Sequence, residues 1–186
     1  PAGEYTARIT KGTATYDTKI QLVADPNSLH SDADRRAQYE TTMRLYNLTE
    51  QLAYTVDQVD AIREGAADRL TKDAKLKKGV DPLLKQLDAM KETLVVTKGD
   101  NYVGSAEPQL REKLATLYSE VAGYYGKPSN AQLANLKVLE DQFNAGQAKL
   151  EAFKAKQLTA LNATLAKAKL DEIKLRPFDE FKSADK

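Results

Sequence analysis

The longest regular feature of the sequence is a run of helical periodicity across residues 130–170. Its large apolar residues lie on one stripe: Leu133, Leu136, Phe143, Leu150, Phe153, Leu161 and Leu165. No proline interrupts the run, and Gly146 is its only glycine. The pattern therefore predicts one helix of roughly 60 Å, at ~1.5 Å per residue. Because a helix of that length cannot bury its stripe against itself, the rest of the chain must supply packing partners.

Three further helices are predicted before it, over residues 33–70, 81–97 and 108–125. The four lengths run long, short, short, long, and short connections make neighbouring helices antiparallel. We therefore expect a mainly α chain that forms an antiparallel four-helix bundle. Four helices should meet where residues 52–70, 81–97, 108–125 and 130–148 lie together, and residues 33–50 and 150–170 should continue as a two-helix stalk.

The N-terminal segment is typical of a β-hairpin. Apolar and polar residues alternate over residues 4–10 and again over residues 14–23, with a turn at Gly12 between them. Two strands alone are marginally stable in water, so the hairpin needs further strands or the bundle beside it. Asp25 and Pro26 then break the strand. The predicted organisation is a hairpin over residues 1–25, a helical bundle over 28–175 and an irregular tail over 176–186. The opening Pro-Ala-Gly favours a piece of a longer protein.

Composition excludes several classes of function. The 28 Lys and Arg residues balance 27 Asp and Glu residues, for a net charge near +1, so the basic surplus expected of a nucleic-acid partner is missing. The absence of cysteine excludes disulfides and cysteine nucleophiles. No apolar run is long enough to span a bilayer. We expect neither a nucleic-acid partner nor a membrane span.

The chemistry-bearing residues form no catalytic constellation. His30 is the only histidine, and one imidazole is weak support for a metal site. Glu140 and Asp141 are adjacent, as are Asp171 and Glu172, and neighbouring helical positions point about 100° apart rather than toward one shared proton. No phosphate loop, dinucleotide fingerprint or nucleophile elbow is present. We predict that the chain is not an enzyme and has no cofactor, no metal and no catalytic residue.

One apolar strip lacks an obvious partner. Tyr39, Met43 and Tyr46 share a face near the start of the first long helix, and Phe153 is expected opposite them in the stalk. These four residues form the candidate packing or partner face. We expect the hairpin to cover the strip, with the tail or another chain, including a second copy, as alternatives. Gln58 is expected to point outward.

A family resemblance adds to this interpretation. Residues 2–8 (Ala-Gly-Glu-Tyr-Thr-Ala-Arg), the turn at Gly12 and the Val-Ala-Asp-Pro of residues 23–26 resemble the final hairpin of an immunoglobulin-like domain. That domain occurs in large bacterial sortilin-like proteins, which carry BNR-repeat β-propellers and are often labelled glycosyl hydrolases. Residues 34–46, 107–111 and 128–133 are similar to the helical C-terminal region of the same proteins, so the resemblance extends over nearly the whole chain.

The resemblance implies an exported, periplasmic or extracellular protein in which any hydrolase chemistry belongs to an upstream propeller. No catalytic residue carries over. Family members often have a longer glycine-rich insert where this chain has the loop between Gly99 and Ser105, so no role is assigned to that loop.

Two functions from different classes stay open. The first is a non-catalytic C-terminal accessory module whose partners are the upstream domains of its parent protein. The alternative is a free-standing helical-bundle adaptor that binds partner helices through an incompletely covered apolar face.

Overall fold

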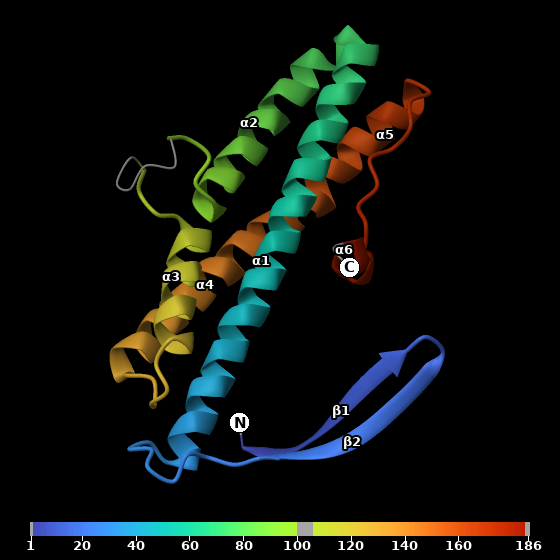
Figure 1. Cartoon of the computed structure of the whole chain (residues 1–186). Coiled ribbons are helices and arrows are strands. Elements are labelled where there is room, and N and C mark those ends of the chain that lie inside the picture. Colours follow the sequence, from blue (N-terminus) through green and yellow to red (C-terminus); the bar gives the residue numbers. More distant parts are fainter. Residues whose placement is uncertain (1, 100–105, 185–186) are drawn as a thin grey trace.

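The chain is mainly helical, with an antiparallel two-stranded hairpin at its N-terminal end (Figure 1). The computed structural model describes residues 2–99 and 106–184. Its 68% helix content agrees with the predicted fold class. The elements in order are β1 (Gly3–Lys11), β2 (Ala14–Leu22), α1 (Asp32–Lys72), the 3-10 turn η1 (Ala74–Leu76), α2 (Lys77–Leu94), α3 (Leu110–Ala122), α4 (Asn130–Phe153), the π-helical segment η2 (Lys154–Leu158), α5 (Thr159–Lys167) and α6 (Phe178–Ala184).

Both long helices begin at capping boxes, in which two orphan backbone amides are satisfied reciprocally. At α1, the hydroxyl of Ser31 accepts from the Asp34 N–H at 3.2 Å, and the Asp34 carboxylate accepts from the Ser31 N–H at 3.1 Å. At α4, Ser129 and Gln132 make the same exchange. These local signals explain why the two starts lie close to the positions expected from the sequence.

The short helices α2 and α3 lie one after the other along α1 (Figure 1). On the C-terminal half of α1, Arg63 pairs with Asp88 of α2 at 2.6 Å. On the N-terminal half, the Gln38 amide donates to the Val121 carbonyl of α3 at 2.9 Å. The predicted four-helix bundle is therefore not confirmed. The predicted stalk is wrong at its α1 end, because α3 packs where the two long helices were expected to be alone.

The core divides into two hydrophobic clusters along the length of α1. The first joins the N-terminal half of α1 to α3 and the start of α4, with Leu45, Leu52, Leu114, Leu136 and Phe143 among its most buried members. The second joins the C-terminal half of α1 to α2, η2 and α5, with Val59, Ile62, Leu87, Leu150 and Leu165. Each short helix thus packs mainly against one half of α1 and of the run formed by α4, η2 and α5.

The run predicted as one helix contains a π-helical segment, η2, between α4 and α5. Phe153 and Leu158 are five positions apart, which would place them about 140° apart on an α-helix. Both are nevertheless buried in the second cluster, at 3% and 8% exposure. The wider π turn returns the chain to the same face after five residues, so the stripe continues without a break.

The C-terminal residues fold back along α1 instead of forming the expected irregular tail. Ile173 is 6% exposed and belongs to the second cluster. Beyond it, α6 places Phe178 and Phe181 against Tyr54 of α1, with ring centroids 5.2 and 5.4 Å away. The Tyr54 hydroxyl donates to the Arg176 carbonyl at 2.8 Å. We call residues 171–184 the C-terminal strap.

Candidate functional site

The hairpin is amphipathic because its register places the apolar residues of both strands on one face. Tyr5 faces Ile20, Ile9 faces Tyr16, and Gly3 faces Leu22. Successive strand residues point to opposite sides, so these side chains share one surface. Gly12 adopts φ +61° in the two-residue turn, a conformation that a glycine provides without strain.

The opposite face of the hairpin is charged and internally paired. The Arg8 guanidinium donates two hydrogen bonds to the Asp17 carboxylate, both at 2.8 Å, and Lys19 pairs with Glu4 at 2.9 Å. The bond from Arg8 lowers the pKa of Asp17 below its ordinary value. Since these charges already have partners on the hairpin, this face needs no other protein surface and can remain exposed to solvent.

The apolar face remains open to solvent. Ile9, Tyr16, Ile20 and Leu22 are 45–63% exposed, and neither strand packs along a helix. Within the described residues the sheet has only these two strands, so both outer edges lack a neighbouring strand. An apolar face with open edges on both sides is the arrangement expected of a surface that another structure covers. We call this surface the hairpin face.

The tyrosine strip is also exposed. Tyr39 is 44% and Tyr46 49% exposed, while Met43 between them is partly buried. The hairpin therefore does not cover the strip within one chain, contrary to the expectation from the sequence. The strap packs instead against Tyr54, about two turns further along α1.

Two other residues lie in environments that the sequence did not predict. Phe153 packs in the second cluster, whereas Leu45, beside the strip, belongs to the first, so Phe153 does not face the strip. Gln58 is 7% exposed and does not point outward. Its amide donates to the Tyr54 hydroxyl at 2.8 Å and accepts from the Lys154 ammonium at 3.3 Å. The sequence did not indicate this burial, because a glutamine outside the apolar stripe of a helix is usually exposed to water.

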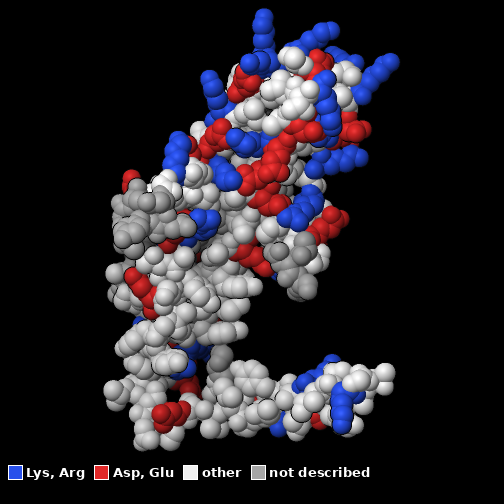
Figure 2. Space-filling view, turned by 45° about the horizontal axis from the view of Figure 1, so that its top comes forward, with Lys and Arg blue, Asp and Glu red and all other residues white. Residues whose placement is uncertain are grey.

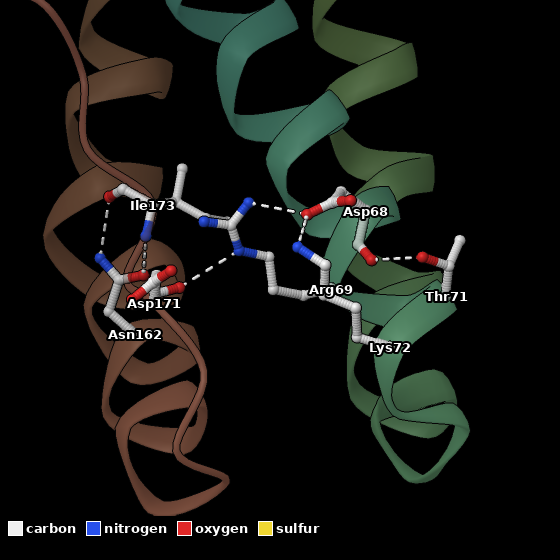
Figure 3. A network of polar contacts seen from close by, with 7 residues as sticks. All are labelled: Asp68, Arg69, Thr71, Lys72, Asn162, Asp171 and Ile173. Atoms are coloured by element: carbon white, nitrogen blue, oxygen red, sulfur yellow. Dashed lines mark hydrogen bonds and ion pairs between the residues drawn. The ribbon is translucent and has the colours of Figure 1, made fainter.

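A polar network fastens the strap to the helices (Figure 3). Asn162 of α5 holds the Ile173 backbone from both sides, donating to its carbonyl at 3.1 Å and accepting from its N–H at 2.9 Å. Arg69 of α1 donates to the Asp171 carbonyl at 3.2 Å and pairs with Asp68. The bond from Lys72 lowers the pKa of Asp68. Because the groups of this network hydrogen-bond and pair with one another, the network is typical of a structural arrangement.

His30 has a packing environment rather than a set of metal ligands. Its ring meets Tyr124 edge to face, with centroids 5.4 Å apart, and a Cβ added at Gly126 would lie 2.8 Å from the ring. Within residues 2–99 and 106–184, no group of three His, Asp or Glu side chains is placed to hold a metal ion. The loop between Gly99 and Ser105 lies largely outside the described residues.

The adjacent carboxylates named from the sequence serve as separate surface groups. Glu140 pairs with Arg44 of α1 at 2.6 Å, and Asp141 pairs with Lys137 on its own helix. Asp171 contributes its backbone carbonyl to Arg69, and Glu172 pairs with Lys174 at 3.4 Å. Neither pair shares a proton or a common partner.

In the part of the chain that the structure describes, no helix has the length and apolar character needed to cross a membrane. Comparison with protein-family models, with characterised proteins and with solved structures finds no match.

Proposed function

We propose that the chain is a non-catalytic interaction module whose hairpin face docks on β-structure of its parent protein. The observation that carries this proposal is the open hairpin face, with exposed apolar side chains on one side and paired charges on the other. Strand addition at an open sheet edge is a common recognition mode, in which backbone bonds give affinity and side chains give specificity.

The parent that best suits this surface is an exported sortilin-like protein with a BNR-repeat propeller. The resemblance of residues 2–8 and 23–26 to the last hairpin of an immunoglobulin-like domain supports this assignment. In such a protein the upstream strands would cover the hairpin face, and the helical part would form a C-terminal accessory module. Any glycosyl hydrolase activity would belong to the propeller.

Hydrogen exchange of the parent protein and of this chain alone tests the docking. The outward amides of β1 and β2 should exchange quickly in the isolated chain and become protected in the parent. Ile20→Lys should remove that protection, since it places a charge on the hairpin face. Thr6→Lys, on the charged face, is the matched control and should retain protection. Equal exchange in both contexts would contradict the proposal.

The absence of catalysis needs a separate measurement. The purified chain should hydrolyse no glycoside or peptide, because the ring of its single histidine, His30, packs against Tyr124 and the described residues hold no group of three metal-ligating side chains. Turnover on a panel of such substrates, abolished by one substitution within this chain, would overturn this part of the proposal.

A second candidate function rests on the tyrosine strip. Tyr39 and Tyr46 are exposed on a long helix, as expected if a partner helix packs there. In that case Tyr46→Ala would weaken partner binding while Ile20→Lys would not. The opposite result would favour docking through the hairpin face.

A further inference from the structure

The outer edge of β2 is open along its whole length. All nine residues from Ala14 to Leu22 are exposed, and within the described residues no third strand lies beside β2. In Figure 1, β2 is the strand farther from the helices. Figure 2 shows that the hairpin projects away from the helical part, with open space along most of its length. Another strand therefore has room to pair with this edge.

The register of the hairpin determines which backbone groups face that edge. Lys11 and Ala14 close the two-residue turn, and the pair that closes such a turn exchanges both backbone hydrogen bonds. Every second residue of β2 from Ala14 onward therefore bonds to β1, and the residues between them point their N–H and C=O groups outward. The outward residues are Thr15, Asp17, Lys19 and Gln21. A row of such groups is a ready site for strand pairing.

The two charges of this edge favour one register when a second copy of β2 pairs with it. Antiparallel pairing about Thr18 sets Asp17 of each copy directly opposite Lys19 of the other. A shift by two residues sets Asp17 against Asp17 in one direction and Lys19 against Lys19 in the other, and like charges directly opposite each other destabilise a sheet. A shift by one residue opposes outward backbone groups to inward ones. Since Thr18 is the central residue of β2, the favoured register also pairs all nine residues.

The apolar side chains of β2 are complementary in the same register. Tyr16 lies opposite Ile20 of the second copy, and an aromatic side chain beside a β-branched one is a favourable cross-strand pair. At the ends of the strand, the small Ala14 lies opposite the large Leu22. Directly opposite residues share one face of an antiparallel sheet, so the apolar sides of the two hairpins join into one surface.

The charged side chains also match across the two copies. Within one hairpin, Arg8 pairs with Asp17 at 2.8 Å and Lys19 pairs with Glu4 at 2.9 Å. The pairing sets each Asp17 beside Lys19 of the other copy, so the row across four strands reads Arg8, Asp17, then Lys19 and Glu4 of the second copy. The signs of neighbouring charges alternate along the whole row, which favours this pairing.

We propose that the outer edge of β2 pairs with the same edge of a second copy of this chain, antiparallel and centred on Thr18, to form one four-stranded sheet. A lone hairpin is marginally stable in water, whereas three or more strands with one apolar face can be stable. One pair of strands is a small interface, so the dissociation constant is on the order of 100 µM.

This dimer does not rest on the docking proposed above, because it uses neither the apolar side of the hairpin nor the outer edge of β1. Hydrogen exchange in dilute samples reports on the monomer, so the docking test is unaffected by the pairing of β2. The two proposals can therefore fail separately.

Sedimentation equilibrium of the full chain between about 10 µM and 1 mM tests the proposal. The parent should show a monomer–dimer equilibrium. Asp17→Lys and Lys19→Asp should each weaken the dimer at least about tenfold, because each variant opposes like charges across the pair. An equimolar mixture of the two variants should restore a 1:1 dimer to within about threefold of the parent, because opposite charges then face each other again. This recovery also shows that both variants fold.

Arg8→Asp is the matched control for Asp17→Lys. It breaks the same ion pair within the hairpin but alters only β1, so the variant should dimerise within about twofold of the parent.

A cysteine at the centre of the pairing tests the register. The chain has no cysteine of its own. Thr18 would face Thr18 of the second copy as a non-hydrogen-bonded pair, with Cα atoms about 4.5 Å apart, which is within the range of disulfides. Thr18→Cys should therefore give a disulfide-linked dimer with oxidised glutathione. Ala14→Cys, on the same face at the end of β2, should not.

Several outcomes would overturn the proposal. A single monomeric species at about 1 mM would exclude the dimer. A dimer that persists in both Asp17→Lys and Lys19→Asp would exclude the β2 edge, and its loss in Arg8→Asp would then assign it to the β1 edge. A dimer lost only in Tyr46→Ala would belong to the tyrosine strip. Equal cross-linking of Thr18→Cys and Ala14→Cys would exclude the register centred on Thr18.

Discussion

Asn162 illustrates how one side chain can fix a segment that has no regular structure of its own. Its amide makes two hydrogen bonds to the backbone of Ile173 and so holds the strap where that isoleucine enters the core. The added Cβ at Gly65 would lie 3.1 Å from the Ile173 side chain, which shows how closely the strap approaches α1. The position of the strap therefore depends on a side-chain clamp and on one buried anchor.

Replacing Asn162 by alanine should lower the free energy of unfolding by about 1–3 kcal/mol, because two backbone groups of Ile173 lose their partner. Denaturant melts measure this difference. Asn135→Ala, at an exposed position of α4, is the control and should change the free energy of unfolding by less than about 0.5 kcal/mol. Equal losses for the two variants would mean that the clamp contributes nothing.

From the sequence, Tyr46→Ala would be expected to cost more stability than Gln58→Ala. The burial of Gln58 reverses this order. Gln58→Ala should cost about 1–3 kcal/mol, because it removes a buried amide bonded to Tyr54 and Lys154. Tyr46→Ala should cost no more than about 1 kcal/mol in the isolated chain, since that ring is 49% exposed. Unfolding midpoints of the two variants decide the order. A larger loss of stability for Tyr46→Ala would mean that the Tyr46 side of α1 is buried in the folded chain, as the sequence suggested, and that Gln58 is exposed.

The first turn of α1 should respond to acid. The Ser31 hydroxyl, bonded at 2.7 Å, and then the Ser31 N–H lower the pKa of Asp34 from its ordinary value of 3.8. The carboxylate therefore stabilises the folded turn fully above that value, and this contribution is lost as the pH falls through the lower folded-state pKa. The protection factors of amides 32–36, which are exchange rates corrected for their intrinsic pH dependence, should fall over that acid range, and Asp34→Asn should abolish this fall.

At the scale of elements, the sequence predicted the hairpin and the starts of the long helices because those signals are local. Strand alternation, Gly12 and the Ser31 and Ser129 caps act over a few residues. The path of α3 was predicted wrongly, beside the C-terminal half of α1, because an apolar stripe shows that a helix has a buried face but not which half of α1 it covers. The strap was missed because its large apolar residues, Ile173, Leu175, Phe178 and Phe181, follow no single helical or strand period across Pro177.

The π segment does have a sequence signal. The buried stripe reads Leu150, Phe153, Leu158, Leu161 and Leu165, so one step of five interrupts steps of three and four. Counting Leu158 as part of the stripe would have indicated the wider turn. The exposure of the hairpin face was not predictable, since strand alternation shows that a strand has an apolar face but not what covers it.

Deleting Ala155, an exposed residue within η2, should convert the π turn to an ordinary α-helix and keep every leucine of the stripe on its face. The variant should lose no more than about 2 kcal/mol of stability, as for modest core adjustments. Deleting Ala148, an exposed residue of α4 outside η2, rotates one side of the stripe by about 100° and should cost much more. Thermal melts followed at 222 nm compare them, and equal losses would contradict a π turn at this position.

At the scale of the whole molecule, the hairpin contributes no residue to the two hydrophobic clusters of the helical part. Neither strand packs along a helix, and the two hydrophobic clusters contain only residues from the helices, the segment after α2 and the strap. We therefore expect the helices to fold without support from the hairpin.

Ile20→Lys should accordingly change the free energy of unfolding of the helices by no more than about 0.5 kcal/mol, as for other surface substitutions. Leu48→Ala, in the first cluster, is the positive control and should cost about 2–5 kcal/mol. Helical ellipticity against denaturant gives both values. A large loss for Ile20→Lys would show that the hairpin supports the helices directly.

The uninterrupted length of α1 has a mechanical consequence. It is one helix of 41 residues, roughly 60 Å long at ~1.5 Å per residue, with the hairpin before its first turn and α2 after its last. Both hydrophobic clusters pack against it along most of that length, so bending the helix would disrupt contacts in one cluster or the other. A partner that holds the hairpin therefore lies near one end of a stiff spacer, and the lysine-rich turn between α1 and α2 lies roughly 60 Å away at its other end.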